Sequence, residues 1–189
     1  MKISHIAIIP DGNRRYGKKM GISIEQSHQL GAKRMEELLT WIKQADIPIA
    51  TIYCLSKDNL KRNKKELKDL FTLIEDKLFD LLKNKEDISV NIIGNSNHWT
   101  KRLIDIASGY NNNPNSKYNL NLLIAPDKVE INNLDLLIRT GGMHRLSGFP
   151  INAYTTIYFS NSLFPEFSKG EFDYIINEWY PKQIQNFGR

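Results

Sequence analysis

The stretch Ile6-Ala7-Ile8-Ile9-Pro10-Asp11-Gly12-Asn13-Arg14-Arg15 begins as an apolar run and ends in an acid, a glycine and two arginines. Its isoleucine-rich first half lacks helical spacing and is stopped by Pro10 and Gly12, so we expect a short buried strand over 3–9. The second half predicts a loop, 11–15, that follows this strand. A loop with a carboxylate, a permissive backbone and two guanidinia is suited to holding a metal ion and a phosphorylated ligand.

The rest of the chain alternates between predicted helices and strands. Helical spacing of apolar residues predicts helices over 26–45, 64–85, 98–110 and 170–180. Apolar runs predict strands over 49–55, 90–94, 120–125, 134–140 and 154–159. This alternation predicts an α/β fold with a central, mainly parallel sheet flanked by helices. Because no linker or repeat interrupts the pattern, we expect residues 1–189 to form a single domain.

Composition places the chain among ordinary globular proteins, since 41% of its 189 residues are hydrophobic and 25% are charged. The net charge of +5 favours anionic partners mildly, and leaves phosphorylated small molecules, nucleic acids and anionic membrane surfaces open. Cys54 is the only cysteine and lies in an apolar run, which indicates a buried structural thiol and a reducing compartment. With no apolar run near the roughly 18 residues of a spanning helix and no cleavage site, we expect a cytoplasmic protein.

Three polar segments follow predicted strands, where ligands of parallel sheets bind. In the first, Asp11 is a hard oxygen ligand for Mg²⁺, Gly12 permits close approach, and Arg15 is a bidentate phosphate donor. An Asp-Gly-Asn triplet also makes plain turns, but the paired arginines favour a ligand site. His28, near the start of the first predicted helix, is placed to donate to a phosphate, although a structural role remains open.

The other two segments are 56–62 and 139–147. The former offers the hydroxyl, amide and guanidinium groups of Ser56, Asn59 and Arg62, and equally fits a helix start capped by Ser or Asp. The latter combines two arginines, two glycines and two hydroxyl residues, a set that grips a diphosphate well, against the alternative of a structural glycine turn. The apolar stripe of the predicted helix 64–85 fits a core helix or the wall of a ligand channel.

Other chemistries lack their residues. The single cysteine lies in a predicted strand, the four histidines are dispersed, and no glycine-rich loop ends in Gly-Lys-Ser/Thr. The residues therefore predict a protein that binds a phosphorylated ligand at three strand ends.

In order and spacing, these segments resemble the cis-prenyltransferases, the family of undecaprenyl diphosphate synthase. The similar pieces are HIAIIPDGN at 5–13, SHQLGA at 27–32, TIYCLS at 51–56, DLLIRTGG at 135–142, HRLS at 144–147 and FPEF at 164–167. The resemblance implies an α/β fold with a parallel sheet and an apolar tunnel. It also implies cis condensation of an allylic prenyl diphosphate with isopentenyl diphosphate, with Mg²⁺ as cofactor.

The resemblance assigns roles and partners by position. Asp11 would bind Mg²⁺ and act in catalysis, together with Ser56, Asn59 and Arg62. The implied substrate-binding residues are Gly12, Asn13, Arg14, Arg15, Tyr16, His28, Leu60, Arg139, Arg145, Leu146 and Ser147. The implied assembly is a homodimer, or a heterodimer with a full-length relative, with peripheral membrane contact and no nucleic acid partner.

The chain departs from the family at several positions. Thr156 stands where the family has a Mg²⁺-binding glutamate, and Ile24 where it has a phosphate-binding arginine. The connection 126–133 is too short for the usual helices, and 185–188 lacks the usual terminal arginines.

Two hypotheses follow from these departures. One is an active, divergent prenyl diphosphate synthase that makes short products or joins two allylic units. The other is a non-catalytic subunit that binds isoprenoid diphosphate. The intact aspartate loop favours the enzyme.

Overall fold

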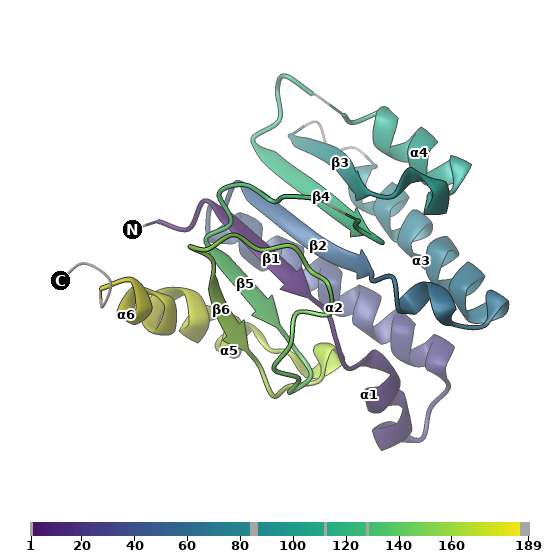
Figure 1. Ribbon diagram of the computed structural model, residues 1–189, viewed down its shortest axis with the longest axis horizontal. Coiled ribbons are helices and arrows are strands. Elements are labelled where there is room, and N and C mark those ends of the chain that lie inside the picture. The colour runs from purple at the N-terminus through teal and green to yellow at the C-terminus, as the bar shows by residue number, and fades with distance from the viewer. Residues whose placement is uncertain (1, 84–86, 112, 128, 186–189) are drawn as a thin grey trace.

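A six-stranded sheet forms the centre of the molecule in the computed structural model, which describes residues 2–83, 87–111, 113–127 and 129–185 (Figure 1). All neighbouring strands are parallel, in the order β3-β4-β2-β1-β5-β6. The strands are β1 (His5–Ile9), β2 (Ile49–Leu55), β3 (Ile88–Gly94), β4 (Tyr118–Ile124), β5 (Leu136–Arg139) and β6 (Thr156–Phe159). The predicted α/β fold is confirmed.

The helices are α1 (Asn13–Met20), α2 (Ile24–Gln44), α3 (Lys64–Leu82), α4 (Lys101–Ser108), α5 (Lys169–Tyr174) and α6 (Tyr180–Gln185), with a π-helical segment Ile175–Trp179 between the last two. Helices α1 to α4 connect the first four strands as crossovers, and α5 and α6 follow the last strand. Side chains fix the starts of the two longest helices. Ser23 and Gln26 form a capping box at α2, and Asn63 accepts from the backbone N–H of Glu66 at α3. None of the helices in the described residues is long and apolar enough to cross a membrane.

One helix was missed by sequence reasoning. The segment 11–15, predicted as a loop, contains the start of α1, and Gly12 precedes the helix with φ of 115°. No apolar stripe marks α1, because it is short and mostly charged. Gly17 instead lets α1 approach α2 closely, since a Cβ at Gly17 would lie 3.1 Å from the Ser27 Cβ. Close packing, which periodicity does not report, therefore holds this helix.

Boundaries of the other elements shifted by a few residues. The capping residue of α3 is Asn63, where Ser or Asp was expected. The predicted helix 64–85 ends at Leu82, and part of the predicted end, 84–85, lies outside the described residues, as does 186–188 of the terminal segment. The predicted helix 170–180 continues as α6 to Gln185.

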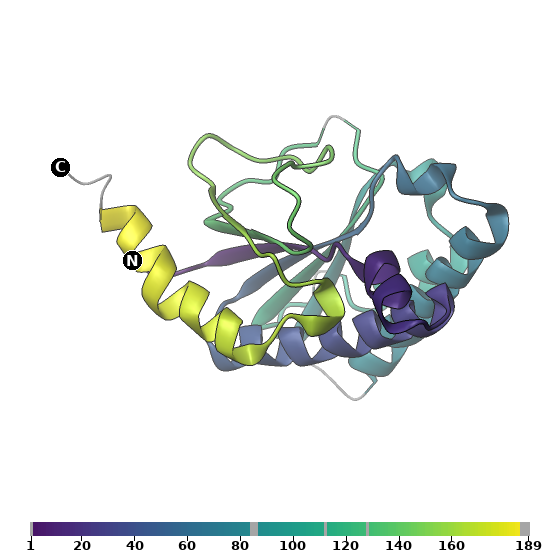
Figure 2. The same ribbon diagram turned by 90° about the horizontal axis from the view of Figure 1, so that it is seen from below.

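The two faces of the sheet are covered differently (Figure 2). Ile6, Ile8 and Ile138 lie on the face that packs against α2, α3, α4 and α5, and they are fully buried. Over the other face run segments without helices, and its polar side chains pair across strands. His5 Nε2 lies 2.7 Å from Thr51 Oγ1, and Asn121 Nδ2 donates to that hydroxyl at 3.1 Å. Polar pairs thus satisfy the part of the sheet that the helices leave uncovered.

The topology brings the three polar segments together. Strands β2, β1 and β5 are adjacent and parallel, so their carboxyl ends meet at one edge. The segments that follow these strands are 56–62, 11–15 and 139–147. The fold therefore gathers the predicted polar loops around one site.

Candidate functional site

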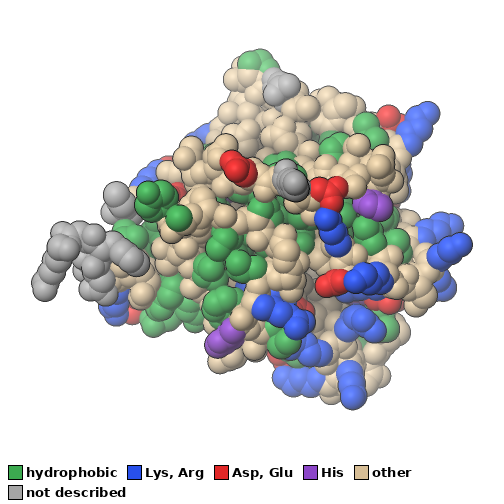
Figure 3. Space-filling model, in the orientation of Figure 1, with side chains coloured by type: hydrophobic (Ala, Val, Ile, Leu, Met, Phe, Trp, Pro, Cys, Tyr) green, Lys and Arg blue, Asp and Glu red, His purple; other side chains and the backbone are tan. Residues whose placement is uncertain are grey.

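A polar cleft lies at the carboxyl ends of β2, β1 and β5. Lys and Arg side chains gather over α1 and the neighbouring strand ends on the face shown in Figure 3. The polar cleft is lined by residues 9–15, 18, 22, 24, 28, 53–56, 58, 59, 62, 70, 139, 145 and 147. All three polar loops contribute to it.

A buried arginine organises the floor of the polar cleft. Arg139 is 3% exposed, and its Nη2 donates to Asp11 Oδ2 at 2.7 Å. Its Nη1 donates to Ser147 Oγ at 2.9 Å and to the carbonyl oxygen of Arg145. Arg139 therefore joins the aspartate loop to the 139–147 loop, and its rigid fork holds both in place.

A second arginine lies on the other oxygen of the same carboxylate. Arg15 Nη2 lies 3.1 Å from Asp11 Oδ1, and Arg15 Nη1 donates to the carbonyl oxygen of Gly141 at 2.5 Å. Gly141 has φ of 89°, and a Cβ there would lie 2.5 Å from Arg15 Nη2. Glycine is therefore required at this position by conformation and by space.

Asn13 lies where α1 meets α2. Its backbone carbonyl accepts from Ser27 Oγ at 2.5 Å, and its Nδ2 donates to the carbonyl oxygen of Pro10 at 3.2 Å. Among the described residues, Asn13 Oδ1 is buried without a hydrogen-bond partner. A Cβ at Gly31 would lie 2.1 Å from this oxygen, so glycine on α2 makes room for the asparagine. Unpartnered buried acceptors are costly, which marks Asn13 as a candidate ligand-binding residue.

The 56–62 loop is held by a reciprocal pair of hydrogen bonds. Asn59 Oδ1 accepts from the backbone N–H of Ser56 at 2.9 Å, and Ser56 Oγ accepts from that of Asn59 at 3.2 Å. The pairing uses acceptor oxygens, so the Ser56 hydroxyl proton and Asn59 Nδ2 remain available to donate to an anion, beside the Arg62 guanidinium of the same loop.

Charged groups surround His28 on the other wall. Burial lowers the pKa of His28, and the guanidinium of Arg62 lowers it further. Arg62 Nη1 in turn lies 3.2 Å from Glu66 Oε1, and Arg14 Nε lies 3.9 Å from the same oxygen. His28 is therefore neutral at pH 7 and offers one donor and one acceptor.

Most of the predicted site residues meet in the polar cleft, and three do not line it. Those on the cleft are Asp11, Gly12, Asn13, Arg14, Arg15, His28, Ser56, Asn59, Arg62, Arg139, Arg145 and Ser147. Leu60 packs against the main core, and Leu146 packs against the smaller core on the other face of the sheet. Tyr16 lies on α1 away from the cleft lining.

Sequence reasoning missed Lys18 and Glu66. Lys18 lines the polar cleft one helical turn after Arg14 and Arg15, a spacing that becomes visible once α1 is known to be a helix. Glu66 stands four residues after Arg62, the spacing of a helical ion pair. Ile24, predicted to replace a phosphate-binding arginine, does line the polar cleft.

Thr156, which stands where the family has a Mg²⁺-binding glutamate, lies away from Asp11 within the chain. Thr156 starts β6 and pairs with Leu136, whereas Arg139 beside Asp11 ends β5 and pairs with Phe159. Three residues of strand separate the two levels, about 10 Å. Within one chain, Thr156 thus lies toward the amino ends of the strands, away from the carboxyl ends where Asp11 lies.

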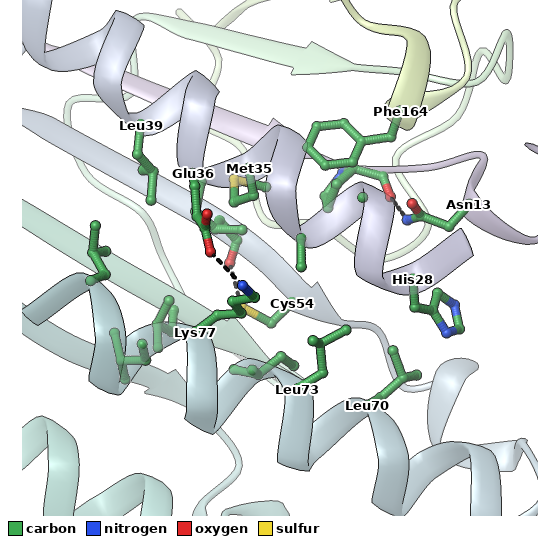
Figure 4. A pocket seen from close by; sticks show the side chains of 18 of the residues that line it. Asn13, His28, Met35, Glu36, Leu39, Cys54, Leu70, Leu73, Lys77 and Phe164 are labelled. Atoms are coloured by element: carbon green, nitrogen blue, oxygen red, sulfur yellow. Dashed lines mark hydrogen bonds and ion pairs between the residues drawn. The ribbon is translucent and has the colours of Figure 1, made fainter. Parts of the chain in front are cut away.

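An apolar cleft adjoins the polar one, between α2 and α3 over β2 and β4 (Figure 4). The apolar cleft is lined by residues 10, 13, 28, 31, 32, 35, 36, 39, 52, 54, 70, 73, 74, 77, 78, 81, 120, 122 and 164. Pro10, Asn13, His28, Cys54 and Leu70 line both clefts, so the two are continuous. A molecule with an anionic head and a hydrocarbon tail fits this pair of surfaces.

The apolar cleft bears on two interpretations of the sequence, the role of the apolar stripe of α3 and the state of the Cys54 thiol. The α3 stripe serves both proposed purposes, since Leu70 and Ile74 line the cleft while Phe71 and Leu82 belong to the buried core. Cys54 is a free thiol on the cleft floor, and part of its surface is exposed to solvent. Burial by surrounding atoms nevertheless raises the pKa of Cys54 to about 12, so the thiol stays protonated and unreactive.

Comparison with known proteins agrees with this architecture. The profile of a family described as "Putative undecaprenyl diphosphate synthase" matches residues 9–127 and 123–188. The two matched segments meet at the short connection between β4 and β5, where the sequence predicted a missing region. This break agrees with that prediction.

Curated relatives span nearly the whole chain. Proteins named tritrans,polycis-undecaprenyl-diphosphate synthase (geranylgeranyl-diphosphate specific) from Thermoplasma volcanium and Thermoplasma acidophilum are 32% and 33% identical. Each alignment covers 98% of this chain and 88% of the relative, over 230 positions. Because this chain has 189 residues, those relatives carry segments that it lacks.

A solved structure shares the fold. The lavandulyl diphosphate synthase of Lavandula x intermedia, determined with dimethylallyl diphosphate, superposes with a TM-score of 0.81 and 24% identity. The superposition covers 95% of each chain.

Proposed function

Because the chain belongs to the undecaprenyl diphosphate synthase family, we propose that it is a prenyltransferase that joins an allylic prenyl diphosphate to isopentenyl diphosphate by cis condensation. The observation that carries this proposal is the continuity of the polar and apolar clefts through Pro10, Asn13, His28, Cys54 and Leu70. An allylic prenyl diphosphate has a head and a tail that match the two surfaces.

The polar cleft supplies the groups that help an allylic diphosphate to leave. When the bond between the allylic carbon and the diphosphate oxygen breaks, both electrons go to the diphosphate, and negative charge grows there. Arg15, which is 46% exposed beside Asp11, turns its fork from the carboxylate to that oxygen. Lys18 and Arg14 add positive charge on the same wall. Cations fixed before the reaction stabilise this charge strongly.

We assign the 56–62 loop to the reacting carbons, because Ser56, Asn59 and Arg62 line the polar cleft. Asn59 Nδ2 and the Ser56 hydroxyl donate toward the diphosphate, and Arg62 adds its charge near His28. Condensation joins the allylic carbon to the terminal double-bond carbon of isopentenyl diphosphate and expels a proton from the neighbouring CH₂ group. These three side chains orient a diphosphate oxygen that accepts this proton.

The 139–147 loop binds isopentenyl diphosphate. Arg145 lines the polar cleft and is exposed, so its guanidinium can reach an incoming ligand. Ser147 also lines the cleft, and its Oγ accepts from Arg139 Nη1 at 2.9 Å. The two residues form a second anion site on the same floor.

Mg²⁺ fits this site as an ion shared with substrate. Among the described residues, no cluster of three or more His, Cys, Asp and Glu side chains could hold a metal. Mg²⁺, however, commonly uses one or two carboxylates together with substrate phosphates. Asp11 is 31% exposed on the cleft, so one carboxylate is open to such an ion. Asp11 would hold the ion, which neutralises charge on the diphosphate when bound.

A product assay tests the proposal. Purified protein with Mg²⁺ and radiolabelled isopentenyl diphosphate is given dimethylallyl, geranyl, farnesyl or geranylgeranyl diphosphate, and a parallel reaction pairs two allylic diphosphates. We expect labelled prenyl products whose formation Asp11→Ala and EDTA abolish. Asp173→Asn, which removes a carboxylate from a surface ion pair, is the matched control and keeps activity. Absence of Asp11-dependent product from every pairing contradicts the proposal.

We also propose assembly as a homodimer. Strand β6 is the edge of the sheet, and Ile151 and Tyr154 beside it are 39% and 92% exposed. An edge strand with exposed apolar neighbours invites pairing with another chain. Light scattering of the purified protein at several concentrations should give twice the chain mass. A monomer that becomes active only with a full-length relative favours the heterodimer instead.

Finally, we propose that the protein works in the cytoplasm in peripheral contact with membranes. Met20 and Ile24 are 53% and 42% exposed, next to Lys18 and Lys19 on α1. Apolar side chains beside lysines suit an anionic lipid surface. Co-sedimentation with anionic vesicles, weakened by salt and by Met20→Ser, is the expected result, and equal binding to neutral vesicles contradicts it.

A further inference from the structure

We propose that the ion pair between Glu36 and Lys77 limits the length of the prenyl tail that the apolar cleft accepts. This inference rests on the proposed function, since it assumes a prenyl tail in that cleft.

The pair crosses the apolar cleft from one wall to the other. Glu36 comes from α2 and Lys77 from α3, and Lys77 Nζ lies 2.9 Å from Glu36 Oε1. Figure 4 shows the two side chains reaching toward each other between the helices. Their neighbours along the two walls are the apolar side chains Met35, Leu73 and Ile74. The pair is thus a polar bridge in an apolar lining.

Its place along the cleft follows from helix geometry. The junction with the polar cleft is marked by His28 on α2 and Leu70 on α3. Glu36 lies eight residues after His28 on α2, and Lys77 lies seven residues after Leu70 on α3. At a helical rise of 1.5 Å per residue, the bridge is about 10–12 Å from the junction. Leu39 and Leu81 continue the lining beyond it. Tails of increasing length therefore meet apolar surface first, then the bridge.

Charge makes the bridge a barrier to hydrocarbon. The side chains of Glu36 and Lys77 are 41% and 38% exposed, so water solvates the pair. The hydrogen bond with Glu36 raises the pKa of Lys77, which keeps the ammonium charged. A tail that passes along the bridge removes water from both ions, and desolvation of an ion pair is unfavourable. Each added isoprene unit before the bridge gains binding energy, and units at the bridge gain little.

Two double variants test the limit by the same measurements. Glu36→Leu with Lys77→Leu replaces the pair by apolar side chains, and Glu36→Lys with Lys77→Glu keeps an ion pair in reversed order. Dissociation constants for dimethylallyl, geranyl, farnesyl and geranylgeranyl diphosphate are measured by calorimetry with each protein, and product lengths by chromatography. Circular dichroism and thermal unfolding establish that each variant is folded.

For each protein we compare the affinity for the longest diphosphate with that for the shortest. We expect this ratio to be about tenfold higher in the apolar variant than in the wild type, and its products to be longer by at least one isoprene unit. The reversed pair should keep the wild-type length preference. Equal preference in all three proteins, or uniformly weaker binding by the apolar variant, overturns the proposal and leaves the pair a structural contact. Because the dissociation constants are measured without turnover, they test the proposed limit on tail length even if the product assay fails. Failure of the wild type to bind any prenyl diphosphate overturns both proposals.

Discussion

The polar and apolar clefts share five lining residues and differ in how they are built. The polar cleft is made of loops at the ends of three strands, and the buried Arg139 joins two of them through Asp11 and Ser147. The apolar cleft is made of side chains in the middle of α2 and α3, held at a distance by helix packing. The comparison teaches that the head of a ligand is recognised by fixed hydrogen bonds, and its tail by the spacing of two helices.

The largest effect is expected from breaking the polar floor at its centre. Arg139→Leu removes the guanidinium that joins the aspartate loop to the 139–147 loop and leaves Asp11 without its main partner. We expect kcat to fall by roughly 10²–10³-fold, the range for loss of one preorganised charge-stabilising group. Steady-state kinetics measure this loss, with Lys65→Leu as a surface control that keeps activity. Activity within a few-fold of wild type would remove Arg139 from the centre of the site.

A smaller loss of binding is expected at the paired glycines, where two variants separate a clash with Arg15 from backbone strain. Gly141 and Gly142 both have positive φ, of 89° and 68°. A Cβ at Gly141 would lie 2.5 Å from Arg15 Nη2, whereas the nearest atom to one at Gly142 lies 3.6 Å away. Alanine at either position costs about 1–2 kcal/mol of stability. Only Gly141→Ala should also weaken diphosphate binding, by about tenfold in calorimetry. Equal weakening by both variants would show that the loop backbone, not Arg15, matters.

The apolar cleft should respond by tail length. Ala32 lines this cleft near its junction with the polar one, and Ala32→Phe fills the space a tail would use. We expect roughly tenfold weaker binding of farnesyl diphosphate, because each CH₂ kept from burial costs about 0.8 kcal/mol, and little change for dimethylallyl diphosphate. Thr72→Phe, at an exposed position of α3 outside both clefts, is the control. The same loss for both ligands would place the tail elsewhere.

Neighbouring lysines on α1 give a finer test of the polar wall. Lys18 lines the polar cleft, and Lys19 lies 2.5 Å from Glu166 Oε1 outside it. Lys18→Ala should weaken diphosphate binding by a few-fold, and more at low salt, because exposed charges are screened. Lys19→Ala should leave the affinity unchanged. Identical behaviour of the two variants would mean that only overall charge attracts the ligand.

The smallest effect concerns pH. The pKa of His28 is lowered below its ordinary 6.5, chiefly by burial. As pH falls below 6.5, His28 becomes protonated in the unfolded chain but stays neutral in the folded protein. The free energy of unfolding therefore falls until the pH passes the lowered pKa of the folded state. In urea unfolding, His28→Gln should lose part of this slope between pH 7 and 5, while His5 keeps its own share. An unchanged slope would show that His28 titrates alike in both states.

Sequence alone specified the polar side better than the apolar side. Asp11, Arg139 and Ser147 carry unusual chemistry at strand ends, and parallel topology then forces their loops together. The apolar lining was ambiguous, because Ile74 in a cleft wall and Phe71 in the core belong to one helical stripe. Lys18 was hidden because α1 owes its place to packing at Gly17, and packing leaves no periodic signal. The separation of Thr156 from Asp11 could not be predicted, since a motif match gives no distance.

The central claim is that one ligand spans both clefts. A crystal structure with an uncleavable thio analogue of farnesyl diphosphate and Mg²⁺ tests it most directly. We predict the diphosphate among Asp11, Arg15 and Asn13, and the hydrocarbon tail between α2 and α3 over Cys54. A tail that lies outside this cleft, or a diphosphate away from Asp11, would contradict the account.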